Sequence, residues 1–187
     1  MGLNKVTNMN GTPETILAQA TELCTADEVA AALQRMADEI TAKLGAENPL
    51  VLCVMKGAVV FAGQLLPLLK FPIGFDYLHA TRYRGETTGS GLAWLHRPAA
   101  VLEGRTVLLV DDILDEGHTL KAVRDWCEDQ GAARVKIAVM AIKQHDRCVP
   151  GLEADYSGFS VPDRYVFGYG MDINEHGRNL PGIYALI

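Results

Sequence analysis

The feature that most constrains this chain is an apolar run that passes directly into a cluster of acidic residues. Residues 107–119 read Val-Leu-Leu-Val-Asp-Asp-Ile-Leu-Asp-Glu-Gly-His-Thr. A continuous run of branched apolar residues is typical of a strand buried on both faces of a parallel sheet. Residues 120–130 follow with the apolar spacing of an amphipathic helix. The pattern therefore predicts a strand that breaks at Asp111, where an acidic turn begins, and then a helix.

The acidic cluster requires an explanation, because carboxylates packed this closely repel one another. Two carboxylates about 5 Å apart repel by roughly 0.8 kcal/mol even in water. A divalent cation with a hydroxyl-rich ligand would relieve this repulsion, and Mg²⁺ usually combines carboxylate oxygens with substrate phosphates. Open α/β sheets bind ligands at the carboxyl ends of their strands, so a binding site is expected here. A solvated acidic loop is the alternative interpretation.

Strand-like and helix-like segments alternate along most of the chain. We expect strands at residues 50–55, 73–79, 107–110 and 135–142, and short strands near residues 94–95, 156–159 and 165–167. We expect helices at residues 13–23, 25–44, 58–69 and 120–130. The second helix should open with a capping box of Thr25 and Glu28 and end at Gly45. This alternation predicts an α/β fold, with a mostly parallel twisted sheet and helices on both faces.

Composition narrows the class of protein further. A length of 187 residues predicts one domain, spanning residues 1–187. The formal charge of −6 argues against a nucleic-acid binder that relies on general basic attraction. The four cysteines contain no CxxC pair, the five histidines lack metal-ligand spacing, and no apolar run is long enough to span a membrane. The N-terminus lacks the apolar core of a signal peptide, so we expect a cytoplasmic protein.

The acidic segment resembles the phosphoribosyl-pyrophosphate (PRPP) motif of the type I phosphoribosyltransferases. That motif has apolar residues, two acids, two apolar residues, Asp, a small residue, Gly, any residue, and Thr or Ser. Further matches extend the likeness from about residue 50 to residue 178 and resemble the hypoxanthine-guanine phosphoribosyltransferases in particular. The resemblance implies the type I phosphoribosyltransferase fold, with a small hood from the terminal segments. It also implies Mg²⁺-dependent transfer of ribose 5-phosphate from PRPP to N9 of hypoxanthine or guanine, giving IMP or GMP and pyrophosphate.

The resemblance assigns roles within the motif itself. Asp111 and Asp112 would contact the ribose hydroxyls, directly or through Mg²⁺, although one of them could instead cap the helix. Asp115 would be the catalytic residue, placed beside N7 of the purine to take or hold the proton that the base loses. Backbone N–H groups of the turn would bind the 5′-phosphate, together with the Thr119 hydroxyl. The residues of this turn are Asp115, Glu116, Gly117, His118 and Thr119.

This chain departs from the commoner motif at two positions. Glu116 stands where Thr is frequent, and His118 stands where a basic or small residue is frequent. A carboxylate beside a phosphate is unfavourable. We therefore expect the Glu116 side chain to point away from the phosphate and to contribute only its backbone N–H group.

Two other segments match the anion-binding parts of the family. The resemblance assigns Lys56 and Gly57 to the pyrophosphate, and in that family the peptide between this pair is often cis. Residues 81–92 are polar and contain three glycines, so we expect a mobile loop or loose hairpin there, and residues 82–91 combine the glycines, arginines and hydroxyl groups of a lid that closes over a site. Tyr83 is the residue of this loop that the resemblance carries over. A surface lysine before a glycine turn and a disordered loop are the alternatives.

The remaining matches concern the base and the pyrophosphate. A lysine can donate a hydrogen bond to a purine 6-oxo group but cannot accept one from a 6-amino group, so Lys143 would select hypoxanthine and guanine. By resemblance, Tyr165 stacks on the purine and the backbone of Val166 reads its edge. Asp172 would bind Mg²⁺ and Arg178 would contact pyrophosphate. A solvent-exposed lysine and a plain core strand are the alternatives. The expected metal ligands are Asp111, Asp112 and Asp172.

Competing functions remain at this point. The same fold could serve xanthine or a pyrimidine base, and purine competition would separate these substrates. A non-catalytic regulator could keep the PRPP site and bind nucleic acid, although the net negative charge and the intact Asp115 weigh against this alternative. We expect PRPP and a purine base as partners, and no nucleic acid or membrane. We also expect a homodimer or homotetramer, formed through apolar surface on residues 58–69.

Overall fold

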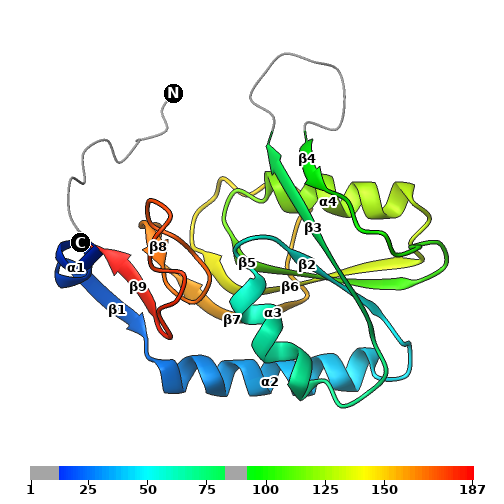
Figure 1. The fold of residues 1–187 in the computed structure, drawn as a ribbon, viewed down its shortest axis with the longest axis horizontal. Helices are drawn as coiled ribbons and strands as arrows, with labels where there is room; N and C mark the ends of the chain where they lie inside the picture. The colour runs from blue at the N-terminus through cyan, green and yellow to red at the C-terminus, as the bar shows by residue number, and fades with distance from the viewer. Residues whose placement is uncertain (1–12, 83–91) are drawn as a thin grey trace.

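The computed structural model describes residues 13–82 and 92–187, and its centre is a six-stranded sheet (Figure 1). The strand order is β4-β3-β2-β5-β6-β7, and every neighbouring pair is parallel except β3 and β4. The strands are β2 (Leu50–Val54), β3 (Gly74–Arg82), β4 (Leu92–His96), β5 (Thr106–Leu114), β6 (Arg134–Lys143) and β7 (Tyr156–Val161). The predicted mostly parallel sheet is confirmed.

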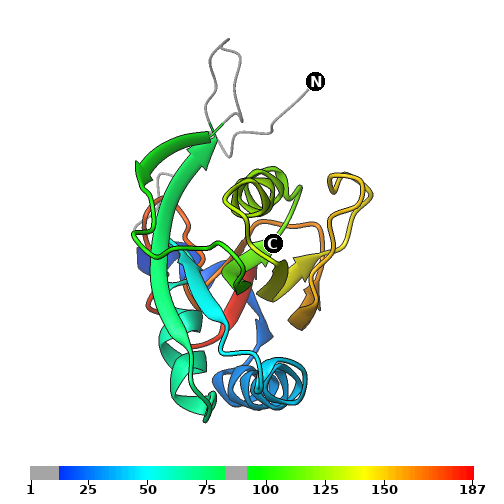
Figure 2. The same ribbon diagram turned by 90° about the vertical axis from the view of Figure 1, so that its right-hand side faces the viewer.

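Helices cover both faces of this sheet, as predicted (Figure 2). The first face carries α2 (Ala26–Leu44) and α3 (Val59–Leu65), which a 3₁₀ turn extends to Leu68. The second face carries α4 (His118–Asp129). Successive strand residues point to opposite faces, so Leu108 packs with α2 and α3 while Leu109 packs with α4. This double burial explains why β2 and the central parts of β5 and β6 are continuous apolar runs.

The two terminal segments form a separate three-stranded antiparallel sheet beside the main one, which is the expected hood (Figure 1). Its order is β1-β9-β8, with β1 spanning Ala20–Cys24, β8 spanning Val166–Phe167 and β9 spanning Ile183–Leu186. The predicted helix over residues 13–23 is wrong in its second half, because α1 covers only Pro13–Ala18. Residues 20–24 instead pair with the far end of the chain, a partner that no local pattern reveals.

The key strand β5 is longer than the sequence suggested. The strand was expected to break at Asp111, but β5 continues to Leu114 because β6 pairs with it as far as this residue. On its other side β2 ends at Val54, and the last paired residue of β5 there is Val110. Among the described strands, β5 therefore has no partner on this side beyond Val110, which leaves a step at the carboxyl edge of the sheet.

The structure also tests the predicted helix ends and the predicted hairpin. The capping box of α2 is present, with Thr25 N–H donating to Glu28 Oε2 at 2.8 Å and Glu28 N–H donating to Thr25 Oγ1 at 3.3 Å. Helix α4 begins at His118, two residues before the predicted start. The described ends of the expected hairpin pair as antiparallel strands, with Arg82 opposite Leu92. Within the described ranges, no helix is both long and apolar enough to cross a bilayer.

Candidate active site

A cavity of about 500 Å³ lies at the carboxyl edge of the sheet, where β5 extends beyond the end of β2. Its floor is the segment that joins β5 to α4, and residues after β2 and from the hood supply the walls. The predicted site residues that line it are Gly57, Asp111, Asp112, Asp115, Glu116, Gly117, His118, Thr119, Asp172 and Arg178. The fold thus brings together residues that lie as far apart in sequence as Gly57 and Arg178.

A second cavity of about 230 Å³ adjoins the first. It contains all the residues that the sequence assigned to base binding, together with carboxylates that it shares with the larger cavity. Its lining is Asp112, Ile113, Asp115, Lys143, Tyr165, Val166, Met171 and Asp172. Because Asp115 belongs to both linings, it lies at the junction between the two spaces.

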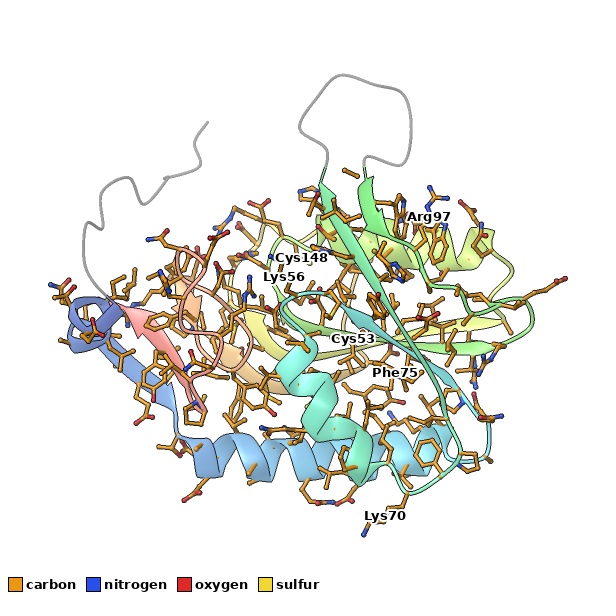
Figure 3. All side chains as sticks on the ribbon, viewed as in Figure 1. Cys53, Lys56, Lys70, Phe75, Arg97 and Cys148 are labelled. Carbon is orange, nitrogen blue, oxygen red and sulfur yellow. The ribbon has the colours of Figure 1, made fainter. Side chains whose placement is uncertain are left out.

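One predicted residue that the structure describes is not part of either lining, and one other cannot be placed. Lys56 is exposed on the turn between β2 and α3, beside Gly57 but outside both cavities (Figure 3). The cis peptide in this turn joins Met55 to Lys56, one bond before the peptide that the family resemblance had indicated. Tyr83 lies outside the described residues, so its predicted role stays a prediction.

Asp111 and Asp112 both line the larger cavity, and neither caps a helix, since the residue before α4 is Gly117. Their carboxylates accept nearby backbone N–H groups, from Asp112 to Asp111 Oδ1 at 2.9 Å and from Ile113 to Asp112 Oδ1 at 2.8 Å. Burial, followed by the charge of Asp112, raises the pKa of Asp111 well above its usual value, and burial also raises the pKa of Asp112. Two half-buried carboxylates whose charges are this costly fit a site for a divalent cation.

Gly57 allows the turn after β2 to approach these acids closely. A Cβ atom at this position would collide with the carboxylate of Asp112. On the hood side, Gly170 has a φ of 99°, and a Cβ there would collide with the carbonyl oxygen of Gly57. The backbone of residue 57 is therefore enclosed from two directions, which only glycine permits.

Replacing Gly57 with alanine is expected to lower kcat/KM by about 10²-fold, because the new methyl group displaces Asp112 by an ångström or more. Gly63 in α3 offers a matched control, since a Cβ there meets no atom within 4 Å. Gly63→Ala should keep full activity. Steady-state kinetics on both variants would measure kcat/KM. Equal values for the two variants would contradict the close approach of Gly57 to Asp112.

The hood side of the cavity is organised around Arg178. Its guanidinium donates to Asp172 Oδ1 at 2.5 Å and to the carbonyl oxygen of Gly170 at 2.6 Å. The other carboxylate oxygen of Asp172 accepts the Glu175 N–H at 2.9 Å. Across residues 13–82 and 92–187, no three His, Cys, Asp or Glu side chains converge as a metal-binding group, so the three predicted metal ligands do not form one preassembled cluster.

Asp115 is held by two donors from a single segment. Lys143, the last residue of β6, places Nζ 2.5 Å from Asp115 Oδ2, and His145 places Nε2 2.6 Å from Asp115 Oδ1. Burial raises the pKa of Asp115, but the hydrogen bonds from Lys143 and His145 outweigh this effect and the net shift is downward. Asp115 is thus kept as a carboxylate, the form that can accept a proton. No role was predicted for His145 from the sequence, because no motif marks this residue and only the fold brings it to Asp115.

Tyr165 stands at the mouth of the smaller cavity. The residue is 41% exposed, and its hydroxyl donates to the carbonyl oxygen of Asp172 at 3.2 Å. The backbone is fixed from behind, because Leu186 N–H in β9 donates to the Tyr165 carbonyl oxygen at 3.0 Å. Val166 is buried next to it. An exposed ring on a fixed backbone is suited to stacking on a planar ligand.

The turn from Asp115 to Thr119 leads into α4 through Gly117, whose φ of 77° is in the left-handed region. The first backbone N–H groups of a helix have no partner within the helix, and those of α4 lie at the larger cavity. Glu116 Oε2 lies 3.6 Å from His118 Nε2, so the two unusual residues of this turn contact each other.

Together the parallel sheet, the acidic strand end and the helix start define an α/β protein with a site for an anionic, hydroxyl-rich ligand. A model of the phosphoribosyl transferase domain matches residues 19–176, and the chain belongs to that family. The predicted resemblance and the predicted enzyme class, a pentosyl-transferring enzyme, are thereby confirmed.

Several similar proteins are named as hypoxanthine-guanine or hypoxanthine-guanine-xanthine phosphoribosyltransferases. The hypoxanthine-guanine phosphoribosyltransferase of Streptococcus pneumoniae is 36% identical over 161 residues, covering 86% of this chain and 89% of the relative. A solved hypoxanthine-guanine-xanthine phosphoribosyltransferase is 31% identical, with a TM-score of 0.81 over 89% of this chain and 96% of the other. A hypoxanthine-guanine phosphoribosyltransferase from Bacillus anthracis is 28% identical, with a TM-score of 0.79 and coverages of 89% and 97%.

Proposed function

We propose that this chain transfers ribose 5-phosphate from PRPP to N9 of hypoxanthine or guanine, giving IMP or GMP and pyrophosphate. The observation that carries the proposal is the pairing of Lys143 with Asp115 in the smaller cavity, directly beside the acidic larger one. A 6-oxopurine needs one donor for its oxygen and one acceptor for its ring N–H. Lys143 and Asp115 are such a pair, and the names of the relatives agree with this choice of substrate.

In this proposal each cavity receives one part of the reaction. The larger cavity takes the phosphoribosyl group, with the 5′-phosphate on the turn before α4 and the pyrophosphate toward Arg178. The smaller cavity takes the base, which stacks on Tyr165 and presents its edge to the backbone of Val166. Lys143 leaves Asp115 to meet the purine oxygen, and Asp115 receives the proton that the ring nitrogen loses. Removing water from the ribosyl centre would suppress its hydrolysis.

Mg²⁺ is part of the proposal. Asp111 and Asp112 on one side and Asp172 on the other would hold it, with PRPP oxygens and water as further ligands. When bound, the ion would neutralise charge that develops on the departing pyrophosphate. The raised pKa values of Asp111 and Asp112 support this assignment, because a cation would offset the cost of both charges.

The solved neighbour that is named for hypoxanthine, guanine and xanthine makes xanthine the second base to consider. We also propose a single domain, a cytoplasmic location and a homodimer or homotetramer. The four cysteines are free, which fits a reducing compartment. Phe61 and Leu65 of α3 are buried, so an interface would involve Val59 of α3 with the exposed Phe75 and Tyr77 of β3.

Product formation tests the proposal. The protein is incubated with PRPP and hypoxanthine or guanine, in Mg²⁺ or in excess chelator, and the nucleotides are separated by chromatography. IMP or GMP should appear with Mg²⁺ and not with the chelator. Absence of both nucleotides under saturating PRPP and Mg²⁺ would overturn the proposed reaction, and metal-independent product would overturn the role of Mg²⁺.

Replacing Glu116 with threonine is expected to lower the KM for PRPP by about threefold to tenfold. Glu116 lines the larger cavity, so even a side chain turned toward His118 keeps its charge near the 5′-phosphate, and removing one unit charge about 6 Å away gains roughly 1 kcal/mol in water. Glu153, an acid of the loop before β7 that lines neither of the two cavities, offers the control Glu153→Thr. An unchanged KM for Glu116→Thr would mean that the carboxylate lies too far from the phosphate to repel it.

A further inference from the structure

His145, for which the sequence predicted no role, follows the end of β6, yet its side chain is almost completely buried against Asp115. Its side chain is 3% exposed, whereas that of its partner Asp115 is 39% exposed and faces the cavities. Lys143, the other donor to Asp115, is 14% exposed. The two donors approach opposite oxygens of one carboxylate, Lys143 at Oδ2 and His145 at Oδ1.

The hydrogen bonds around the His145 ring fix its tautomer. Nδ1 accepts the backbone N–H of Arg147 at 3.1 Å, and a ring nitrogen that accepts carries no proton. In the neutral ring the proton therefore sits on Nε2 and is donated to Asp115 Oδ1. The ring needs no positive charge to make this contact.

The loop that carries His145 is anchored at three points. Gln144 N–H donates to the Val161 carbonyl oxygen at 2.8 Å, and Val149 N–H donates to the Glu116 carbonyl oxygen at 2.9 Å. Between them, the Arg147 guanidinium makes two hydrogen bonds to Asp163, at 2.8 and 2.9 Å. Asp163 lies just before Tyr165, so the same clamp joins the loop to the wall of the base cavity.

We propose that His145 is a positioning residue that holds Asp115 through Oδ1, so that Oδ2 is the oxygen presented to the purine. The inference rests on the proposed function, in which Lys143 turns from Oδ2 to the oxygen of the base. Oδ2 is then free to accept the proton from the ring nitrogen, and Asp115 becomes a neutral carboxyl while His145 keeps its own proton. In a protein without His145, the Asp115 carboxylate would lose its second hydrogen-bond donor once Lys143 has turned to the base.

The pH dependence of the reaction should report this contact. Once Lys143 has turned to the base, His145 is the donor that still stabilises the charge of Asp115. Removing it raises the pKa of Asp115, so the acid limb of the activity profile, where Asp115 loses its proton as pH rises, moves to higher pH. The other charged groups around this carboxylate are Arg147 and Asp163 on the loop side, Asp172 and Arg178 on the hood, and Asp112 and Glu116 on its own segment.

The test compares His145→Leu with His145→Gln, whose side-chain amide retains an N–H donor. In the leucine variant, kcat should fall about tenfold to 10²-fold, with the KM for PRPP within about twofold of wild type. Its acid limb should move up by about half a unit to one unit, and the glutamine variant should recover most of both effects. His96→Leu, on β4 and outside both cavities, is the control and should behave as wild type. A leucine variant with an unmoved acid limb, or a glutamine variant no better than leucine, would overturn the proposal.

Two NMR measurements on ligand-free protein separate this inference from the proposed function. Nitrogen shifts of the wild-type imidazole should report the Nε2–H tautomer for His145, and an Nδ1–H tautomer would overturn the inference without any variant. The carboxyl carbon of Asp115 should titrate at higher pH in His145→Leu than in wild type, and an unchanged titration would also overturn it. Both results hold whether or not the wild-type protein turns over PRPP with a purine.

Discussion

Asp115→Asn should lower kcat by about 10²- to 10³-fold while leaving the affinity for PRPP nearly unchanged. Asparagine keeps the shape of the side chain, but its amide nitrogen cannot accept a proton. It also offers only one oxygen to the two donors, Lys143 and His145, that now occupy both oxygens of the carboxylate. The loss should therefore appear in the chemical step, which single-turnover kinetics isolates from binding and product release.

Asp125→Asn is the matched control for this experiment. Asp125 is also paired with a lysine, Lys121, but it lies on α4 outside both cavities of the site. Its replacement should leave kcat within about twofold of wild type, as expected for a surface ion pair. If Asp115→Asn abolished PRPP binding while single-turnover chemistry stayed intact, Asp115 would be a PRPP ligand rather than the proton acceptor.

Lys143→Met should remove most of the preference for guanine over adenine. Sites built to hydrogen-bond one substrate group reject an analogue without it by about 10⁴- to 10⁵-fold, and the donor that enforces this choice is lost. We expect kcat/KM for guanine to fall by about 10²-fold or more, with little gain for adenine. Loss of the lysine hydrogen bond should also raise the pKa of Asp115, which moves the acid limb of the profile upward.

Lys136→Met removes the same charge from the other end of the same strand. Lys136 pairs with Asp155 at 2.7 Å, away from both cavities, and its replacement should change neither rate nor base preference. Base preference is measured as the ratio of kcat/KM values for guanine and adenine in each variant. An unchanged ratio in Lys143→Met would show that another group reads the base.

The elements that the sequence predicted well are those whose signals are local. The apolar run of β5, the turn at Gly117 and the capping box of Thr25 depend on neighbouring residues, so their patterns are visible in a short window. The hood was different, because β1 is a strand only through its pairing with β9 at the other end of the chain. Its residues, Ala20–Cys24, carry no alternating pattern strong enough to replace that partner.

The predictions for the site divide in the same way, into residues with a local sequence signal and contacts without one. Motif spacing predicted Asp111, Asp112 and Asp115 on one segment, and the structure lines the cavities with them. Two contacts depend instead on three-dimensional closeness, the approach of Gly57 to Asp112 and the hydrogen bond from His145 to Asp115. No spacing rule predicts either of them, because each joins segments that only the parallel sheet brings together.

The central claim is transfer from PRPP to a 6-oxopurine, and pyrophosphate release tests it most directly. The protein is supplied with PRPP and Mg²⁺ together with hypoxanthine, guanine, xanthine, adenine or uracil in turn. Release with hypoxanthine and guanine, and none with adenine or uracil, is the predicted result. Release with adenine or uracil in their place would contradict the roles of Lys143 and Asp115 in base selection. No release with any base, at concentrations where PRPP binds, would contradict the reaction itself and favour a PRPP-binding regulator.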